Sequence, residues 1–491
     1  MVNVIVELSK YIMIILMAVY TFSCFSVFAQ VYEEDKKWIL IRQNVLMFLI
    51  QFTAYLVMYL QTEEKKLVFF YLAQVVLLIA ILVLYRVLYP KVSRLIVNNM
   101  CMLLSIGFIM ITRLTYSKAV KQFIFAVLGT VIGLFVPVLI RKLKFLKDWG
   151  YIYAGIGILA LGAVAVLGQI SDGAKLGFTI AGFGVQPSEF IKILFVFFVA
   201  ASLNRSTSFK NVVITTAIAA AHVLILVIST DLGAALIMFV VYLVMLYVAT
   251  RNPFYAIAGI GGGSVAAVLG YHMFSHIKVR VSAWQDPFAS YSEGGYQVAQ
   301  SLFAIGTGSW FGMGLYQGLP DSIPVAAEDF IFSAISEEMG LIFALCLILV
   351  CVSCYVMFLN IAMAIRNQFY KLIALGLGTC YIFQVFLTIG GVTKFIPSTG
   401  VTLPLVSYGG SSMLSTMIMF GIIQGLYILR EDEEEIIEKR RERDIRRSEP
   451  GGRAPGKKQP PKQPPKRPSE QPPKQRRKKP AFEEVPQQRV R

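Results

Sequence analysis

Apolar runs recur along most of this 491-residue chain, and they limit more than any other feature what it can fold into. A helix of about 20 apolar residues spans about 30 Å of hydrocarbon and satisfies its own backbone hydrogen bonds there. Hydrophobic residues make up 56% of the chain and charged residues only 15%, a balance too apolar for a surface that faces water. The sequence therefore predicts an all-α polytopic membrane protein.

Thirteen segments have the length and composition of a membrane span. Charged residues such as Glu63 and Lys66, and helix breakers such as Pro90 and Pro253, set several of their ends. The predicted spans are 10–31, 39–62, 67–89, 97–113, 120–140, 150–169, 187–204, 211–229, 231–250, 254–273, 330–361, 371–392 and 407–429.

Lysine and arginine in short loops predict which ends of the spans face the cytoplasm. The basic positions that share one side, if the hairpins alternate, are 141–147, 205–210, Arg251 and 366–371. The charged C-terminus falls on that cytoplasmic side too, and the N-terminus on the other. The loops that we expect to be extracytoplasmic are 170–186, 274–329 and 393–406.

One of these outer loops opens a polar stretch from Arg280 to Gly340, which we interpret as the candidate active centre. Its acids are Asp286, Glu293, Asp321, Glu328, Asp329, Glu337 and Glu338. Asp286 directly precedes Pro287, a pattern that predicts a helix start with the aspartate as N-cap. An N-cap carboxylate on an outer loop can also face a substrate, so both interpretations of Asp286 stay open.

Three further places put polar residues near the ends of spans, where ionisable groups are costly and usually functional. Glu189 and Lys192 lie three apart on one helix face, and they either line an outer pocket or cap the helix and pair with each other. Asp231 either caps the next helix or faces the same pocket. In 393–412, Lys394 and clustered hydroxyls could hold a phosphate or a sugar, although loop chemistry also explains the prolines and glycines.

Several other patterns favour no site. The glycines from Gly306 to Gly314 lack the strand that precedes a nucleotide-binding loop. Cys351 and Cys354 form one CxxC without a second pair, and the three histidines are scattered, so neither set predicts a metal site.

The C-terminal segment is predicted to have two parts. Residues 430–447 mix both charges at helical spacing and could continue the last helix. The proline-rich, basic residues from Ser448 onward are predicted to be disordered, and either to contact anionic lipids or an acidic partner, or only to add solubility. Because the net charge of +17 arises partly here, it does not indicate nucleic-acid binding.

Five motifs in a fixed order carry a family resemblance. They are QPSEFIK, DLGAAL, WQDP followed by GGYQ, EDFIFSAISEEMG and PSTGVTLPLVSYGGSS. Together they closely resemble the SEDS family of bacterial shape, elongation, division and sporulation proteins, over residues 97–429.

The resemblance implies a fold with three parts. Residues 1–95 would form about three extra N-terminal helices, residues 96–430 a ten-helix catalytic core, and residues 431–491 a cytoplasmic charged helix and tail. The large extracytoplasmic loop would then lie between the seventh and eighth core helices.

The resemblance also implies an activity at the outer face of the bacterial cytoplasmic membrane. It is the polymerisation of lipid II into glycan strands by an inverting glycosyltransferase that works with a class B penicillin-binding protein. Asp286 would be the general base. The expected substrate-binding residues are Glu189, Lys192, Asp231, Arg280, Lys394, Ser398, Thr399 and Ser407. Basic groups or a divalent cation would offset the pyrophosphate charge.

Two other functions are compatible with a chain of this composition. A lipid II transporter would distribute ionisable residues along a path through the membrane, whereas a polymerase would gather them at the outer face. A non-catalytic scaffold would tolerate replacement of Asp286. Because Glu189, Asp231, Asp286 and Lys394 all map outward, the sequence favours the transferase.

Overall fold

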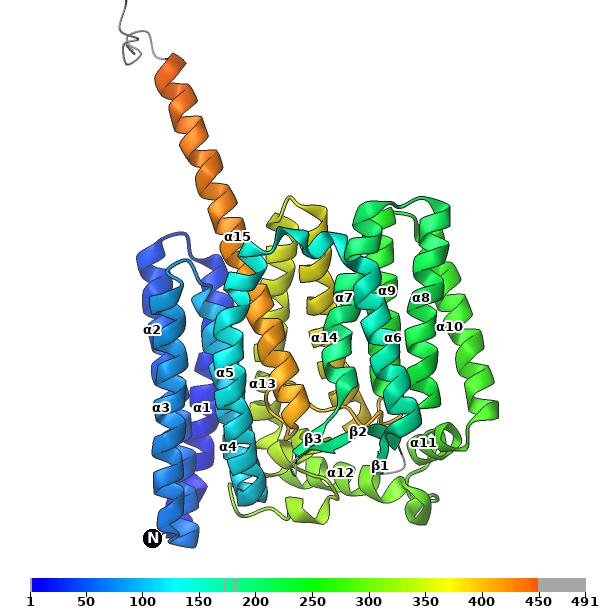
Figure 1. Ribbon diagram of the computed structural model, residues 1–491. Helices are drawn as coiled ribbons and strands as arrows, with labels where there is room; N and C mark the ends of the chain where they lie inside the picture. The colour runs from blue at the N-terminus through cyan, green and yellow to red at the C-terminus, as the bar shows by residue number, and fades with distance from the viewer. Residues whose placement is uncertain (1, 172–173, 181–182, 449–491) are drawn as a thin grey trace, which may run out of the picture. The chain divides into compact units, whose positions relative to one another are not determined.

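The computed structural model describes residues 2–171, 174–180 and 183–448, and these form a largely helical protein (Figure 1). Thirteen of the described helices are long and apolar enough to cross a membrane, which confirms the predicted number. These helices are α1 (Val2–Ala29), α2 (Glu33–Thr62), α3 (Lys65–Leu88), α4 (Arg94–Leu114), α5 (Tyr116–Lys142), α6 (Gly150–Leu167), α7 (Pro187–Arg205), α8 (Phe209–Ile228), α9 (Leu232–Thr250), α10 (Pro253–Met273), α13 (Ile331–Ala364), α14 (Gln368–Val392) and α15 (Gly410–Ser448).

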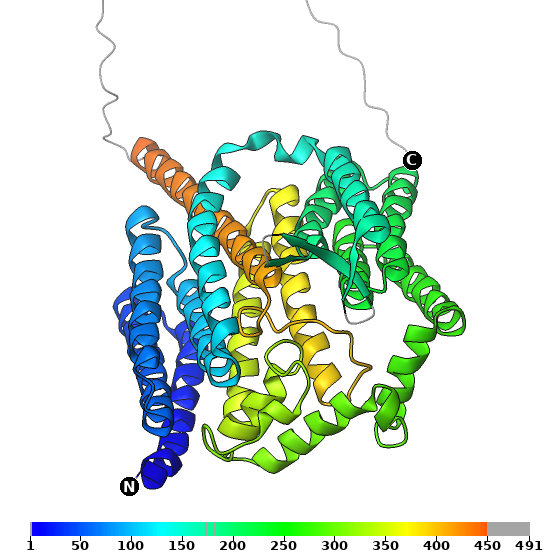
Figure 2. The same ribbon diagram turned by 60° about the horizontal axis from the view of Figure 1, so that its bottom comes forward.

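The loops at the two ends of the helices differ in kind. One end carries the short connections after α7, α9 and α13, together with the 3-10 helix η1 (Lys144–Asp148). The opposite end carries the N-terminus, α11 (Ser275–Gln285), α12 (Gly295–Gly308) and the 393–409 segment (Figures 1 and 2). The structure thus groups the loops as the alternation of basic residues predicted.

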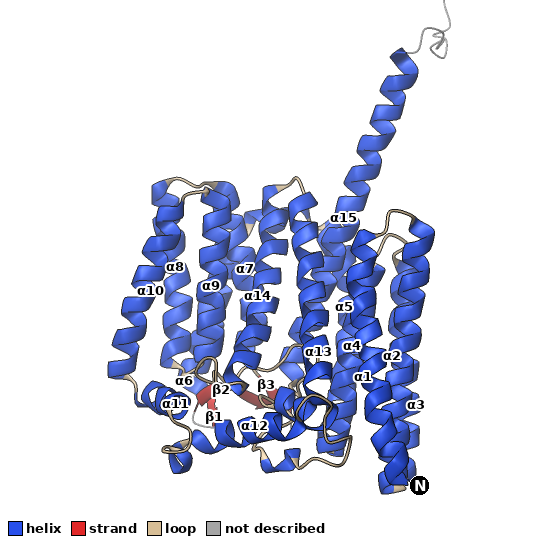
Figure 3. Cartoon of the chain, turned by 180° about the vertical axis from the view of Figure 1, so that it is seen from behind, coloured by secondary structure: helices blue, strands red, loops and turns tan. Residues whose placement is uncertain are grey.

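A small antiparallel sheet replaces part of the loop predicted at 170–186. It has the order β1 (Gln169–Ser171), β2 (Ala174–Ile180) and β3 (Phe183–Val185), with Phe178 opposite Val185. Figure 3 shows the sheet at the same end as α11 and α12. The short strands lack a long alternating pattern, which is why periodicity did not reveal them.

The N-terminal helices are joined to the core by buried hydrogen bonds as well as by apolar packing. Asn99 in the fully enclosed helix α4 accepts a hydrogen bond from the Tyr20 hydroxyl of α1 at 3.1 Å, and it donates one to Ser353 of α13 at 3.2 Å. In α2, Gln43 accepts from Asn98 at 3.0 Å. Such bonds between spanning helices stabilise their association.

Glycines allow the segment before α13 to cross that helix closely. Gly340 has a φ of 87° inside α13, and a side chain there would collide with the backbone of Gly312. The neighbouring amides of Met313 and Gly314 donate to the carbonyls of Glu337 and Glu338 at 2.8 and 2.9 Å. The polar stretch is thereby fixed to the start of α13.

The last spanning helix continues beyond its apolar part. Contacts define one compact unit over residues 1–435, and residues 436–448 form the remainder of α15. Asp432 pairs with Lys91 and with Arg141 at 2.7 Å each, so the compact unit reaches a few residues past the boundary predicted at residue 430. The predicted disordered tail begins at Ser448, which is the last residue of α15; residues 449–491 lie outside the described residues.

Candidate functional site

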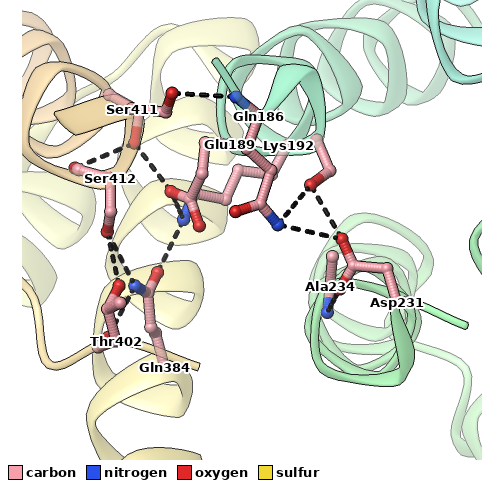
Figure 4. A network of polar contacts seen from close by, with 11 residues as sticks. Gln186, Glu189, Lys192, Asp231, Ala234, Gln384, Thr402, Ser411 and Ser412 are labelled. Atoms are coloured by element: carbon pink, nitrogen blue, oxygen red, sulfur yellow. Dashed lines mark hydrogen bonds and ion pairs between the residues drawn. The ribbon is translucent and has the colours of Figure 1, made fainter. Parts of the chain in front are cut away.

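The predicted pair in α7 forms an ion pair within a larger polar network. Pro187 begins α7, and one turn later the Lys192 Nζ lies 2.6 Å from the Glu189 carboxylate. The same Nζ donates to the side-chain carbonyl of Gln384 in α14 at 2.6 Å, and the Ser415 hydroxyl of α15 donates to Glu189 at 2.9 Å (Figure 4). Because Lys192 is only 2% exposed, its charge depends on these two partners, the Glu189 carboxylate in α7 and the Gln384 carbonyl in α14.

Asp231 caps α9 and also reaches α7. Its Oδ1 accepts from the backbone N–H of Ala234 at 3.1 Å, which is the N-cap contact predicted from the sequence. Its Oδ2 accepts from the Ser188 hydroxyl at 2.8 Å and from the Gln186 amide at 3.3 Å (Figure 4). Burial raises the pKa of the Asp231 carboxyl, and these hydrogen bonds partly oppose that shift.

The 393–409 segment is held against α14 and α15 by its backbone. Gln384 donates to the carbonyl of Thr402 at 2.9 Å, and Thr388 donates to the carbonyl of Val401 at 2.9 Å. The Thr402 hydroxyl in turn donates to Ser412 at 2.8 Å. Gln384 therefore links the segment directly to the Lys192 charge.

Helix α11 docks on the other side of this segment. Arg280 Nη1 donates to the carbonyl of Ser398 at 3.1 Å, and the Trp284 indole donates to the carbonyl of Lys394 at 3.2 Å. Burial lowers the pKa of Arg280, and the charges of Asp329 and Asp231 oppose that shift, so both carboxylates lie within electrostatic reach of the guanidinium.

One buried hydroxyl at this junction lacks a partner. Thr399 Oγ1 makes no hydrogen bond within the described part of the chain, although it is buried. The Thr399 backbone lies against Gly233, directly after the first residue of α9, where a side chain would meet the Thr399 carbonyl at 3.1 Å. A buried hydroxyl without a partner is costly, which makes Thr399 a candidate for a contact with a bound molecule.

Asp286 ends α11 and lies exposed at the same end of the protein. Its Oδ1 accepts from the backbone N–H groups of Phe288 and Ala289 at 3.0 Å each, as an N-cap would, but residues 287–290 form a turn and not the helix start predicted from the sequence. The other carboxylate oxygen accepts no hydrogen bond from a described residue. Asp286 follows Arg280 by six positions, or about 9 Å along the axis of α11.

The contacts link most, but not all, of the expected site residues. Glu189, Lys192 and Asp231 converge through α7, and Arg280, Ser398 and Thr399 meet at the docked segment. Lys394 takes part through its backbone carbonyl, with a φ of 58°. The Ser407 hydroxyl donates to the Glu328 carbonyl at 2.5 Å and accepts from the Leu403 amide at 2.9 Å, so its observed contacts stabilise a turn. Its binding role stays a prediction.

Gln384 is one site residue that the sequence did not predict. It is a single amide within the apolar run of α14, and it is 1% exposed. A polar side chain inside a spanning segment was the available signal.

No cluster of metal ligands is present among the described residues. Three or more His, Cys, Asp or Glu side chains do not come together there as a cation site. Instead, Lys192 and Arg280 lie among the acids of the site, and the side chains present do not fit a metal held by protein ligands alone.

Comparison with known proteins shows the family to which the chain belongs and solved structures that share its fold. The model of the FtsW, RodA and SpoVE family, described as "Cell cycle protein", matches residues 86–431. The chain is 34% identical over 360 residues to "Peptidoglycan glycosyltransferase RodA" of Mycobacterium leprae, covering 68% of this chain and 77% of that protein. It is 31% identical over 347 residues to "Probable peptidoglycan glycosyltransferase FtsW" of Aliivibrio salmonicida, covering 67% and 85%.

Two solved structures share the fold. The crystal structure of the rod shape determining protein RodA of Thermus thermophilus has a TM-score of 0.52 and 21% identity, covering 69% of this chain and 97% of that one. A chain from a peptidoglycan synthase complex, whose description refers to the coordination of polymerization and crosslinking, has a TM-score of 0.59 and 21% identity, covering 69% and 98%. The match to the family model begins at residue 86, in the last turn of α3, so α1, α2 and most of α3 precede it.

Proposed function

Because the chain belongs to the family of FtsW, RodA and SpoVE, the SEDS family, we propose that it is a peptidoglycan glycosyltransferase that polymerises lipid II into glycan strands. Relatives that are named peptidoglycan glycosyltransferases support this activity. The observation that carries the proposal is the meeting of α7, α9, α11 and the 393–409 segment at one end of the helices, with charged groups from each.

The proposed reaction needs a proton acceptor, and Asp286 has the geometry for it. Capping hydrogen bonds orient one carboxylate oxygen, and the other is open to the acceptor's sugar 4-hydroxyl. As Asp286 removes that proton, the hydroxyl oxygen bonds to the anomeric carbon of the donor. The bond from this carbon to the diphosphate oxygen breaks with inversion, and undecaprenyl pyrophosphate leaves.

Basic residues nearby suit the charge of the leaving group. Arg280 is held at the junction by the Ser398 carbonyl, and Lys394 lies four residues before Ser398 in the same segment. Their charges stabilise the pyrophosphate as negative charge develops on it. The unpartnered hydroxyl of Thr399 is placed to contact the sugar or the phosphate of the substrate.

The Glu189 and Lys192 pair acts on the site indirectly in this proposal. Both charges are already paired or hydrogen-bonded inside the protein, so they hold Gln384 and the 393–409 segment in position. We therefore assign them a positioning role, and we assign direct contact with the substrate to residues of α11 and of the segment.

The proposal also includes the side of the membrane on which the site lies, the cellular role and the partners. The loop carrying Asp286 lies outside the cytoplasmic membrane, because basic residues concentrate at the other end of the helices. Its role is in elongation, division or sporulation. The partner is a class B penicillin-binding protein that crosslinks the strands, and the chain from a synthase complex with the same fold supports this pairing. The basic tail contacts anionic lipids.

The proposal is tested with purified protein and fluorescent lipid II, alone and with its penicillin-binding partner. Glycan strands resolved on a gel would support it. Proteoliposomes with lipid II in one leaflet separate it from transport: movement of lipid II to the other leaflet without strand formation would contradict the polymerase and favour the transporter.

A further inference from the structure

A cavity of about 460 Å³ lies at the end of the helices opposite the candidate site. It opens between η1, the start of α6 and the end of α7, and its volume is within the range of about 300–1,000 Å³ that small-molecule sites occupy. The polar side chains that line it are Lys147, Asp148, Tyr151, Ser202, Asn204 and Arg205. Nothing in the proposed reaction uses it.

The charges of this cavity favour an anion. Lys147 comes from η1 and Arg205 from the last turn of α7, so two separate elements bring cations to one opening. Neither cation forms an ion pair with a carboxylate whose side chain the structure describes. Asp148 is the single acid of the lining, so the cations outnumber it.

The backbone adds donors at the same opening. The N-cap of α6, Trp149, makes no side-chain capping bond, so the first amides of α6 have no side-chain acceptor there. Gly150 lets the start of α6 approach α7 closely, because a Cβ atom at this position would lie only 3.1 Å from the side chain of Ala201. The amides of Ile152 and Tyr153 donate to the Trp149 carbonyl, which leaves those of Gly150 and Tyr151 at the start of the helix. Cationic side chains beside such amides are suited to a phosphate.

The surroundings of the cavity are those of a membrane interface. The rings of Phe145 and Trp149 lie 4.7 Å apart and are 40% and 43% exposed. Below them, Ile152, Ile156 and Leu159 form an exposed apolar stripe along α6 at helical spacing. Aromatic residues typically lie at the headgroup level of a bilayer, and an apolar stripe beneath them is suited to acyl chains.

We propose that this cavity binds the phosphate of an anionic phospholipid, with Lys147 and Arg205 on the headgroup and the acyl chains on the exposed side of α6. The helix whose first residues line the cavity also carries the exposed apolar stripe, which favours a lipid over a soluble phosphate. A basic pocket between spanning helices is a recurring type of site for anionic headgroups. The site is independent of lipid II polymerisation at the other end.

The test measures binding of phosphatidylglycerol and phosphatidylcholine to the delipidated full-length protein by native mass spectrometry. Lys147→Gln/Arg205→Gln is compared with Arg366→Gln/Lys371→Gln, which removes the same charge at the same end but away from the cavity. We expect the cavity variant to lose affinity for phosphatidylglycerol by about tenfold or more. The control variant and the wild type should bind it equally, and all three proteins should bind phosphatidylcholine alike.

Competition with soluble glycerol phosphate distinguishes a lipid from a free phosphate. If the soluble anion displaced phosphatidylglycerol at equal concentration, the acyl chains would contribute nothing and the lipid assignment would be wrong. Equal loss of affinity in the control variant would show a general effect of charge and would also overturn the site. The comparison of variants and the competition experiment both measure lipid binding without any polymerisation assay. Their outcome therefore does not depend on the proposed enzymatic function.

Discussion

Lys192 and Glu189 form an ion pair of 2.6 Å on one face of α7, with side chains that are only 2% and 13% exposed. Removing one partner of a buried pair leaves an uncompensated charge, which costs about 3–5 kcal/mol, whereas removing both costs less. We therefore expect Lys192→Met to lower the thermal stability of the purified protein strongly, and Glu189→Gln/Lys192→Met to recover part of the loss. Lys210→Met, on the exposed start of α8, is the control and should change little. A double variant less stable than Lys192→Met would contradict the pairing.

The buried carboxyl of Asp231 predicts a pH dependence of stability. Its pKa is raised above 3.8, so the folded protein holds this proton more tightly than the unfolded chain does. The stability it contributes is complete below the unfolded pKa and is lost as the pH rises through the folded pKa.

Asp231→Asn removes this titration and can keep the cap on α9. Melting curves of both proteins between about pH 4 and about pH 8 should show the variant gaining stability relative to wild type as the pH rises. A difference between the two proteins that does not change with pH would refute the assignment.

The hydrogen bond from Arg280 to Ser398 predicts an effect on activity, because it fastens α11 to the 393–409 segment. Hydrogen bonds from charged groups contribute about 1.5–3 kcal/mol, so Arg280→Gln is expected to slow lipid II polymerisation by about 10–100-fold. Lys278→Gln changes an exposed cation two residues away on the same helix and should retain activity. Equal rates for the two variants would show that the docking of α11 does not matter.

The proposed orientation predicts the labelling of single introduced cysteines. Gln285 is exposed beside Asp286, and Arg366 is exposed at the opposite end, whereas the native cysteines are buried or half-buried. In intact cells, a membrane-impermeant thiol reagent should label Gln285→Cys and leave Arg366→Cys unlabelled until the cells are opened. The reverse pattern would place the candidate site in the cytoplasm.

Much of the fold followed from local sequence, because each spanning helix needs only its own apolar run. The helix ends were less predictable. The sequence placed the first span at residue 10, whereas α1 begins at Val2, and Lys10 is buried there with its Nζ donating to the Gly312 carbonyl at 3.3 Å. That contact joins residues 302 positions apart, and no local pattern reveals it.

The contacts of the candidate site were also only partly predictable from the sequence. The capping contacts of Asp231 and Asp286 were predictable, since they involve residues two or three positions away. The meeting of α7 with α14 through Lys192 and Gln384 was not, because it depends on how distant helices pack. Local chemistry also could not choose Asp286 among the acids of its loop, and the family resemblance made that choice.

The most direct test of the account exploits the two roles of Asp286. Asparagine caps a helical turn about as well as aspartate, but it cannot accept the proton, whereas alanine can do neither. Rates of lipid II polymerisation should be measured for the wild type, Asp286→Asn and Asp286→Ala, all purified and with melting temperatures recorded. We expect Asp286→Asn to melt like the wild type and to lose at least about 100-fold in rate. Strand synthesis by Asp286→Asn at the wild-type rate would contradict the assignment of Asp286 as general base.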